Sequence, residues 1–229
     1  MNRILSEYIK QPGVSQNQRI AAEYKKYVAA GKMGGRARVH ENNILKLYSQ
    51  SRNQISGNSL RYVSEIVFRK VNPKIGGYLK IRLEGGDVTK LQKSIEQKYA
   101  ALSNLEKTYE EVLATKEPYW GVAAFHQIGL AYEQLGDMFT RPPAIKGAKL
   151  EDVKKQLASD AQGAYAKAQQ FYKEGLNLVR KFAVYSDYGA KISTAIARRS
   201  GAKLTFSDWV LTPDFLGSEV SARVRSRVQ

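Results

Sequence analysis

Apolar residues recur every three or four positions along most of the chain, and breaks between these runs divide it into predicted helices. The first run, 15–30, opens at a serine that can cap a helix and stops at a cluster of glycines. Runs 36–55 and 59–71 repeat the pattern, and Asn72-Pro73 closes the second of them because the residue before proline is disfavoured in helical conformation. We predict a helical hairpin followed by a third helix.

The period changes to alternation over Tyr78–Val88, which predicts a short extended segment. Asp87 or Thr89 can then cap a strongly amphipathic helix, whose apolar positions from Ile95 to Leu113 step by three or four. Pro118 has the place that proline takes in the first turn of a helix, and the apolar stripe resumes behind it. These two helices are expected to form a hairpin.

The second half of the chain contains a Pro-Pro pair and a charged run, which we interpret as a lengthened connection over about 136–160. Helical spacing resumes in a long helix that ends near Phe182 and in a last helix over 187–199. The predicted organisation is a leader or helix remnant over 1–14, a helical-repeat domain over 15–204 that includes the insertion, and a C-terminal capping segment and tail over 205–229.

Small residues alternate with aromatic ones on the predicted helices, as in the tetratricopeptide pattern. Phe125, Ile128-Gly129 and Tyr132 match its first helix, whereas Ala168, Tyr172 and Gly175 match its second. We therefore predict an all-α fold, a tetratricopeptide-like solenoid of helical hairpins with irregular connections. Its structural repeat positions are Trp120, Ala123, Ala124, Ile128, Gly129, Tyr132, Ala168, Tyr172 and Gly175.

The span from Leu79 to about Leu204 resembles a known group. It is similar to the C-terminal region of large tetratricopeptide-repeat proteins of gliding and predatory deltaproteobacteria, such as the adventurous-gliding motility repeat lipoproteins. The motifs that carry the resemblance are Ile81-Arg82-Leu83, Lys107–Leu113, Tyr119-Trp120, Ala123-Ala124, Ile128-Gly129, Tyr132-Glu133, Pro142-Pro143, Ala168 and Tyr172. The resemblance implies a non-enzymatic component that holds an envelope assembly together, in the periplasm or at the outer membrane.

Charge is the strongest feature of the composition, with 37 Lys and Arg against 21 Asp and Glu and a formal net charge of +16. Such an excess attracts acidic proteins, nucleic acids or anionic lipids. The cations that we single out as candidates for binding a partner are Arg36, Arg38, Lys70, Lys80, Arg82, Arg180, Lys181, Arg198 and Arg199.

The sequence offers little material for catalysis. It has no cysteine, its two histidines, His40 and His126, lack the spacing of metal ligands, and its glycines match no phosphate-binding motif. We expect no enzymatic activity, no cofactor, no metal and no small-molecule substrate. His126 is expected to be a packed or surface residue.

Two functions remain open at this point. The leading hypothesis is an interaction scaffold that binds other proteins of a multi-subunit assembly through their acidic surfaces. The alternative is a basic nucleic-acid-binding repeat protein that would use its cations and its 14 tyrosines. No apolar run approaches membrane-spanning length. The expected location follows the resemblance if the chain is a fragment of an exported protein, and is the cytoplasm if Met1 is native.

Overall fold

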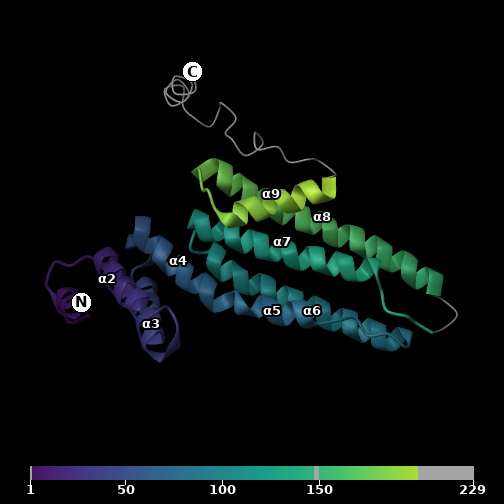
Figure 1. Ribbon diagram of the computed structural model, residues 1–229, viewed down its shortest axis with the longest axis horizontal. Coiled ribbons are helices and arrows are strands. Elements are labelled where there is room, and N and C mark those ends of the chain that lie inside the picture. The colour runs from purple at the N-terminus through teal and green to yellow at the C-terminus, as the bar shows by residue number, and fades with distance from the viewer. Residues whose placement is uncertain (1, 147–149, 201–229) are drawn as a thin grey trace, which may run out of the picture.

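The computed structural model describes residues 2–146 and 150–200, and this part of the chain is all-helical (Figure 1). It contains no β-strand, only an isolated bridge between Gly86 and Ile145. The helices are α1 (Asn2–Lys10), α2 (Gln16–Ala29), α3 (Gly34–Gln50), the 3₁₀ turn η1 (Arg52–Gln54), α4 (Gly57–Val71), α5 (Pro73–Lys80), α6 (Val88–Leu113), α7 (Pro118–Thr140), α8 (Leu150–Phe182) and α9 (Asp187–Ser200).

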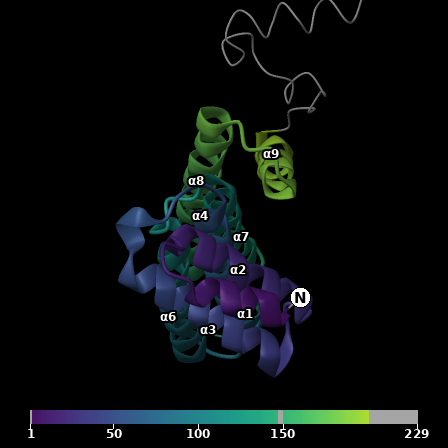
Figure 2. The same cartoon turned by 90° about the vertical axis from the view of Figure 1, so that its left-hand side faces the viewer.

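Helix starts follow the capping residues that the sequence indicated. Ser15 caps α2 in a reciprocal capping box with Gln18, and Asp87 caps α6 by accepting a hydrogen bond from the backbone N–H of Lys90 at 2.8 Å. Pro118 occupies the first turn of α7. The leader over 1–14 is itself mostly helix, since α1 spans Asn2–Lys10 and packs on α2 (Figure 2).

The predicted extended segment at Tyr78–Val88 was wrong in its first part. Asn72 keeps helical angles (φ −57°, ψ −33°), so Pro73 starts α5 directly after α4, and α5 includes Tyr78. Ile75 and Tyr78 are both buried, a three-residue spacing that belongs to a helix. Extended backbone begins only at Ile81, and no strand lies beside it in the described residues.

The predicted connection over about 136–160 is shorter than expected. Residues 136–140 belong to α7, and α8 begins at Leu150, so much of the charged run is helical. Gly86 ties the connection to the start of α6, because its N–H donates to Ala144 O and its own carbonyl accepts from Lys146 N, both at 3.0 Å. The Pro-Pro pair thus follows the end of α7 and leads the chain past the loop that precedes α6.

The long helices α6, α7 and α8 run side by side, with α5 beside α6 and α9 across the other side of α7 and α8 (Figure 1). Their lengths are 26, 23 and 33 residues. A tetratricopeptide unit has two helices in about 34 residues. Because the three long helices are longer than those of such a unit, the solenoid arrangement stays a prediction. The all-helical class is confirmed for the described residues.

Three hydrophobic cores hold the helices together. The N-terminal core joins α2, α3 and α4, the central core joins α4 to α8, and the C-terminal core joins α7, α8 and α9. Helix α4 contributes Val63 and Ile66 to the N-terminal core and Phe68 and Val71 to the central core. One helix therefore links the two halves of the molecule.

Candidate partner-binding surface

The positive charge is concentrated at the N-terminal end of the chain. Residues 1–82 carry 16 Lys and Arg but only 4 Asp and Glu, whereas the remaining residues carry 21 and 17. This segment, which we call the basic half, therefore holds 12 of the 16 net positive charges. A count by segment would have found this asymmetry in the sequence.

Two of the four acidic residues in this half are buried and serve the fold. Glu65 accepts from Lys32 Nζ at 2.7 Å, from Arg69 Nε at 2.9 Å and from the Tyr24 hydroxyl. Burial raises the pKa of Glu65, but the hydrogen bonds from Lys32 and Tyr24 outweigh it and leave the pKa below its ordinary value. The carboxylate is therefore ionised and balanced internally.

Glu23 is the second buried carboxylate of this half. It accepts from Lys26 Nζ at 2.9 Å and lies 2.8 Å from His40 Nδ1. Burial again raises its pKa, and the bonds from Lys26, His40 and Asn43 lower it further than burial raises it. The exposed cations of this half consequently have few acidic neighbours.

Four exposed cations follow one another in the sequence near the junction of α4 and α5, and we call them the basic strip. They are Lys70 at the end of α4, Lys74 and Lys80 on α5, and Arg82 just after α5. No acidic residue occurs between Glu65 and Glu84. None of the four forms an ion pair within residues 2–146 and 150–200. The strip is therefore a run of exposed cations that are not neutralised by an ion pair in the described residues.

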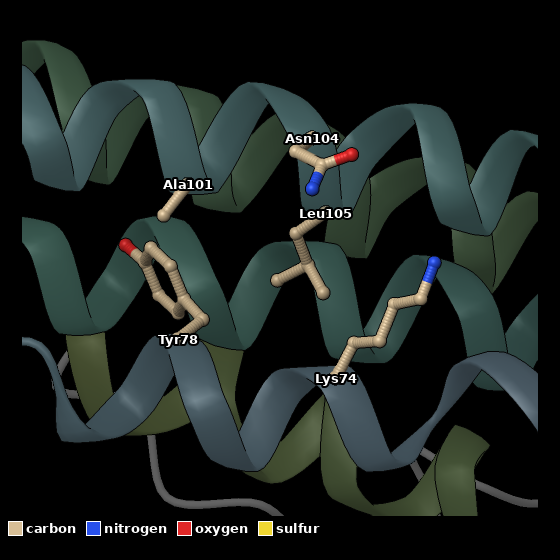
Figure 3. A pocket seen from close by; sticks show the side chains of 5 residues that line it. All are labelled: Lys74, Tyr78, Ala101, Asn104 and Leu105. Carbon is tan, nitrogen blue, oxygen red and sulfur yellow. The ribbon is translucent and has the colours of Figure 1, made fainter.

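A pocket of about 260 Å³ opens beside the basic strip, between α5 and α6 (Figure 3). Its apolar part is made by Leu105, Ala101 and the ring of Tyr78, and its polar part by Lys74 and Asn104. Lys74 Nζ donates to Thr108 Oγ1 at 3.2 Å. The Tyr78 hydroxyl points away to donate to the carbonyl of Ala131 at 2.9 Å. The strip thus borders a small apolar recess.

The structure separates the predicted cations into two groups. Seven are exposed and form no ion pair in the described residues, although they lie on different elements: Arg36, Arg38, Lys70, Lys80, Arg82, Arg180 and Lys181. Arg199 is half-buried, bridges Glu133 and Asp137 at 3.0 Å each, and lies 3.4 Å from the Tyr165 ring centroid. Arg198 also pairs with Glu133. We assign this pair to the attachment of α9 to α7.

The predicted repeat positions lie in the helix seams. Ala123, Ala124, Ile128, Gly129, Ala168, Tyr172 and Gly175 are buried, whereas Trp120 and Tyr132 are partly buried. A Cβ on Gly129 would lie 2.4 Å from the Tyr172 ring, and one on Gly175 would lie 2.5 Å from Ile192. These positions serve packing, and none of them belongs to the basic strip.

The two histidines lie in different parts of the fold: His40 contacts Glu23, and His126 packs among aromatic rings. Burial, and then the charge of Lys191, lowers the pKa of His126 to about 4, so its ring is neutral at pH 7. It lies 5.5 Å from the ring of Tyr188 and 6.3 Å from that of Tyr172. No three potential metal-ligating side chains gather anywhere in the described residues.

Exposed aromatic rings are found away from the basic half. In the described residues they are Tyr99, Phe182 and Tyr185. In the basic half Tyr27 and Tyr78 are buried, and Tyr24 stacks on Tyr62 at 3.9 Å. A stacking platform for nucleobases needs open rings beside cations, and the basic strip has none.

No protein-family model, no curated protein and no solved structure matches the chain. None of the described helices has both the length and the apolar character required to cross a membrane.

Proposed function

We propose that this protein is a non-catalytic interaction module whose basic N-terminal half, and above all the basic strip, binds the acidic surface of another protein. The observation that carries the proposal is the run of exposed cations Lys70, Lys74, Lys80 and Arg82, which form no ion pair in the described residues and have no acidic residue between them in the sequence. Opposite charges on two partners steer their encounter and fix their orientation. The partner is another subunit of a multi-subunit assembly.

The helical hairpins supply the rigid frame for this contact, as in tetratricopeptide-like scaffolds. Close seams such as Gly129 against Tyr172 support that part of the proposal. The resemblance of residues 79–204 to motility repeat lipoproteins supports an envelope assembly, such as a motility machine, at the periplasmic face or the outer membrane. The sequence motifs alone carry this placement.

Nucleic-acid binding is the second candidate, and one observation favours it. At the end of α8, exposed Arg180 and Lys181 lie beside the exposed rings of Phe182 and Tyr185. Cations beside open rings suit single-stranded nucleic acid. The patch is small, and Asp187 follows it at the start of α9. An acidic protein partner therefore fits the larger part of the positive surface.

The test compares two variants of equal net charge. In the strip variant, Lys70, Lys74, Lys80 and Arg82 are replaced by Gln. In the control variant, the exposed residues Lys93, Lys155, Lys167 and Lys173 of the other half are replaced by Gln. Binding of fluorescein-labelled polyglutamate is followed by fluorescence anisotropy at several salt concentrations. We expect the strip variant to lose roughly thirtyfold in affinity, because each of the four exposed contacts contributes about 0.5 kcal/mol, and the control variant to lose much less.

Equal losses in the two variants would refute a localised docking surface. A labelled single-stranded oligonucleotide is measured in parallel with Arg180→Gln/Lys181→Gln. Oligonucleotide binding tighter than polyglutamate binding, with a steep loss on adding salt and on changing that pair, would replace the acidic protein by nucleic acid as the partner.

A further inference from the structure

We propose that the pocket between α5 and α6 receives a single apolar side chain of the partner, and that carboxylates flanking this side chain bind the basic strip. The inference rests on the proposed function, because it names the kind of acidic segment that docks: one with an apolar anchor. Figure 3 shows the arrangement, with the Tyr78 ring and Leu105 between the two helices and Lys74 beside them.

The apolar part of the pocket is suited to an aliphatic or aromatic side chain. Leu105 is 3% exposed and Tyr78 also 3% exposed, so both are core residues that still border open space. Because so little of their own surface is exposed, the gain would come mainly from the apolar surface of the entering side chain, at about 25 cal/mol for each Å² removed from water. A purely acidic chain would leave this recess empty.

The polar part of the pocket is suited to a carboxylate. Lys74 Nζ has three N–H donors, and one of them is directed to Thr108 Oγ1 at 3.2 Å. The side-chain amide of Asn104 is exposed and has no hydrogen-bond partner in the described part of the chain. Both groups can therefore bind the oxygens of a residue next to the anchor.

The size and open shape of the pocket favour a side chain over a free ligand. Sites for small molecules and cofactors usually begin at about 300 Å³ and enclose most of the ligand. This pocket has about 260 Å³ and is open on one side. Its size and open shape suit one side chain of a bound peptide better than an enclosed small molecule.

The pocket is fixed before any partner arrives. Tyr78 is held from behind by its hydroxyl bond to Ala131 O, and the buried ammonium of Lys98 lies 3.6 Å from its ring centroid and donates to its carbonyl at 2.7 Å. Because the ring is already ordered, binding does not cost the freedom of that side chain.

The test uses labelled peptides of glutamate, glycine and serine that differ only at one central residue, which is Ser, Ala, Val or Leu. In the unaltered protein, affinity measured by anisotropy should rise with the size of the central residue, by about tenfold from Ser to Leu. This series needs no variant, so it does not depend on how a substitution folds.

A matched pair of variants then locates the effect. Ala101→Met fills the pocket without changing charge, whereas Ala100→Met places the same side chain on the exposed face of α6, outside the pocket. Filling the pocket should abolish the preference for Leu over Ser and keep the weaker binding of the Ser peptide. The Ala100 variant should keep the preference, and circular dichroism checks the helicity of both.

Each outcome bears on one of the two proposals. Tight binding of all four peptides with equal affinity would overturn the pocket inference and leave the docking of acidic segments intact. Loss of the preference in both Ala variants would also overturn it. Failure of every peptide to bind, even at low salt, would overturn the proposed function itself.

Discussion

Lys98 lies fully buried on α6, and no carboxylate forms an ion pair with it within the described residues. Its ammonium donates instead to the carbonyls of Tyr78 and Ile81, at 2.7 and 3.2 Å. These carbonyls lie at the end of α5, where the unpaired C=O groups of a helix concentrate partial negative charge. Lys98, a residue of α6, thereby caps the C-terminal end of α5.

Burial, and then repulsion from Arg82, lowers the pKa of Lys98 from 10.5 to about 8. Between these two pH values the unfolded chain binds more protons than the folded chain, so the free energy of unfolding rises with pH. We predict that Lys98→Met removes a rise of roughly 3 kcal/mol from the curve over pH 8 to 10.5. Urea unfolding at several pH values measures it.

The control for Lys98 is Lys93→Met, an exposed lysine on the same helix. Tyrosines that titrate at high pH are common to all three proteins and cancel in the comparison. Parallel curves for Lys98→Met and the unaltered protein would show that the ammonium is not desolvated.

At the scale of elements, the seam between α7 and α8 follows an antiparallel register of glycines and tyrosines. Gly129 faces Tyr172 and Gly136 faces Tyr165, with ring atoms 2.4 Å from the position of an added Cβ in each pair. Both glycines and both tyrosines are seven residues apart, in opposite order. Only Gly129 and Tyr172 were predicted as repeat positions, although the spacing was readable for all four.

We predict that Gly129→Ala lowers the free energy of unfolding by about 1–3 kcal/mol, since overpacking exceeds the gain in helix propensity. Tyr172 cannot move aside easily, because its hydroxyl donates to Glu133 at 3.0 Å. The matched control is Gly163→Ala on α8, where nothing lies within 4 Å of the added Cβ.

The control substitution should raise the free energy of unfolding by up to about 1 kcal/mol. Denaturant unfolding of both variants measures the contrast. If Gly129→Ala stabilises the protein as Gly163→Ala does, the seam between α7 and α8 can accommodate the added methyl group and the prediction is wrong.

At the scale of the whole molecule, α4 joins the N-terminal and central cores, and Val67 contacts both. Phe68 lies next to Val67 and packs on Trp120 at 5.0 Å between ring centroids. Because the two cores share α4, a substitution that destabilises one core should also destabilise the other.

We predict one cooperative unfolding transition. Ile20→Ala creates a cavity in the N-terminal core and should lower the free energy of unfolding by about 2–5 kcal/mol. The denaturant midpoint reported by Trp120 in the central core should then fall as much as the midpoint reported by circular dichroism. The measurement uses a Trp209→Phe background, in which Trp120 is the only tryptophan.

An Ile20→Ala protein with an unchanged Trp120 midpoint but an earlier transition by circular dichroism would show that the two halves unfold separately. Phe68→Ala serves as the positive control, because it lies beside the reporter and should shift both signals.

The sequence by itself determined most of the helices, although not α5, the end of α7 or the start of α8. Capping at Ser15 and Asp87 and the proline at Pro118 act within a few residues, so local chemistry suffices to place them. It also determined the charge and its uneven distribution. The predicted capping segment over 205–229 lies outside the described residues.

Tertiary structure alone decided the features that depend on contacts between residues far apart in the sequence. Asn72 and Tyr78 are helical because Ile75 and Tyr78 reach the core, against the local preference before proline. Arg199 is an internal ion-pair residue because α9 folds back on α7, and the α5–α6 pocket exists because residues 74–78 meet residues 101–105. These partners are far apart in sequence, and only packing brings them together.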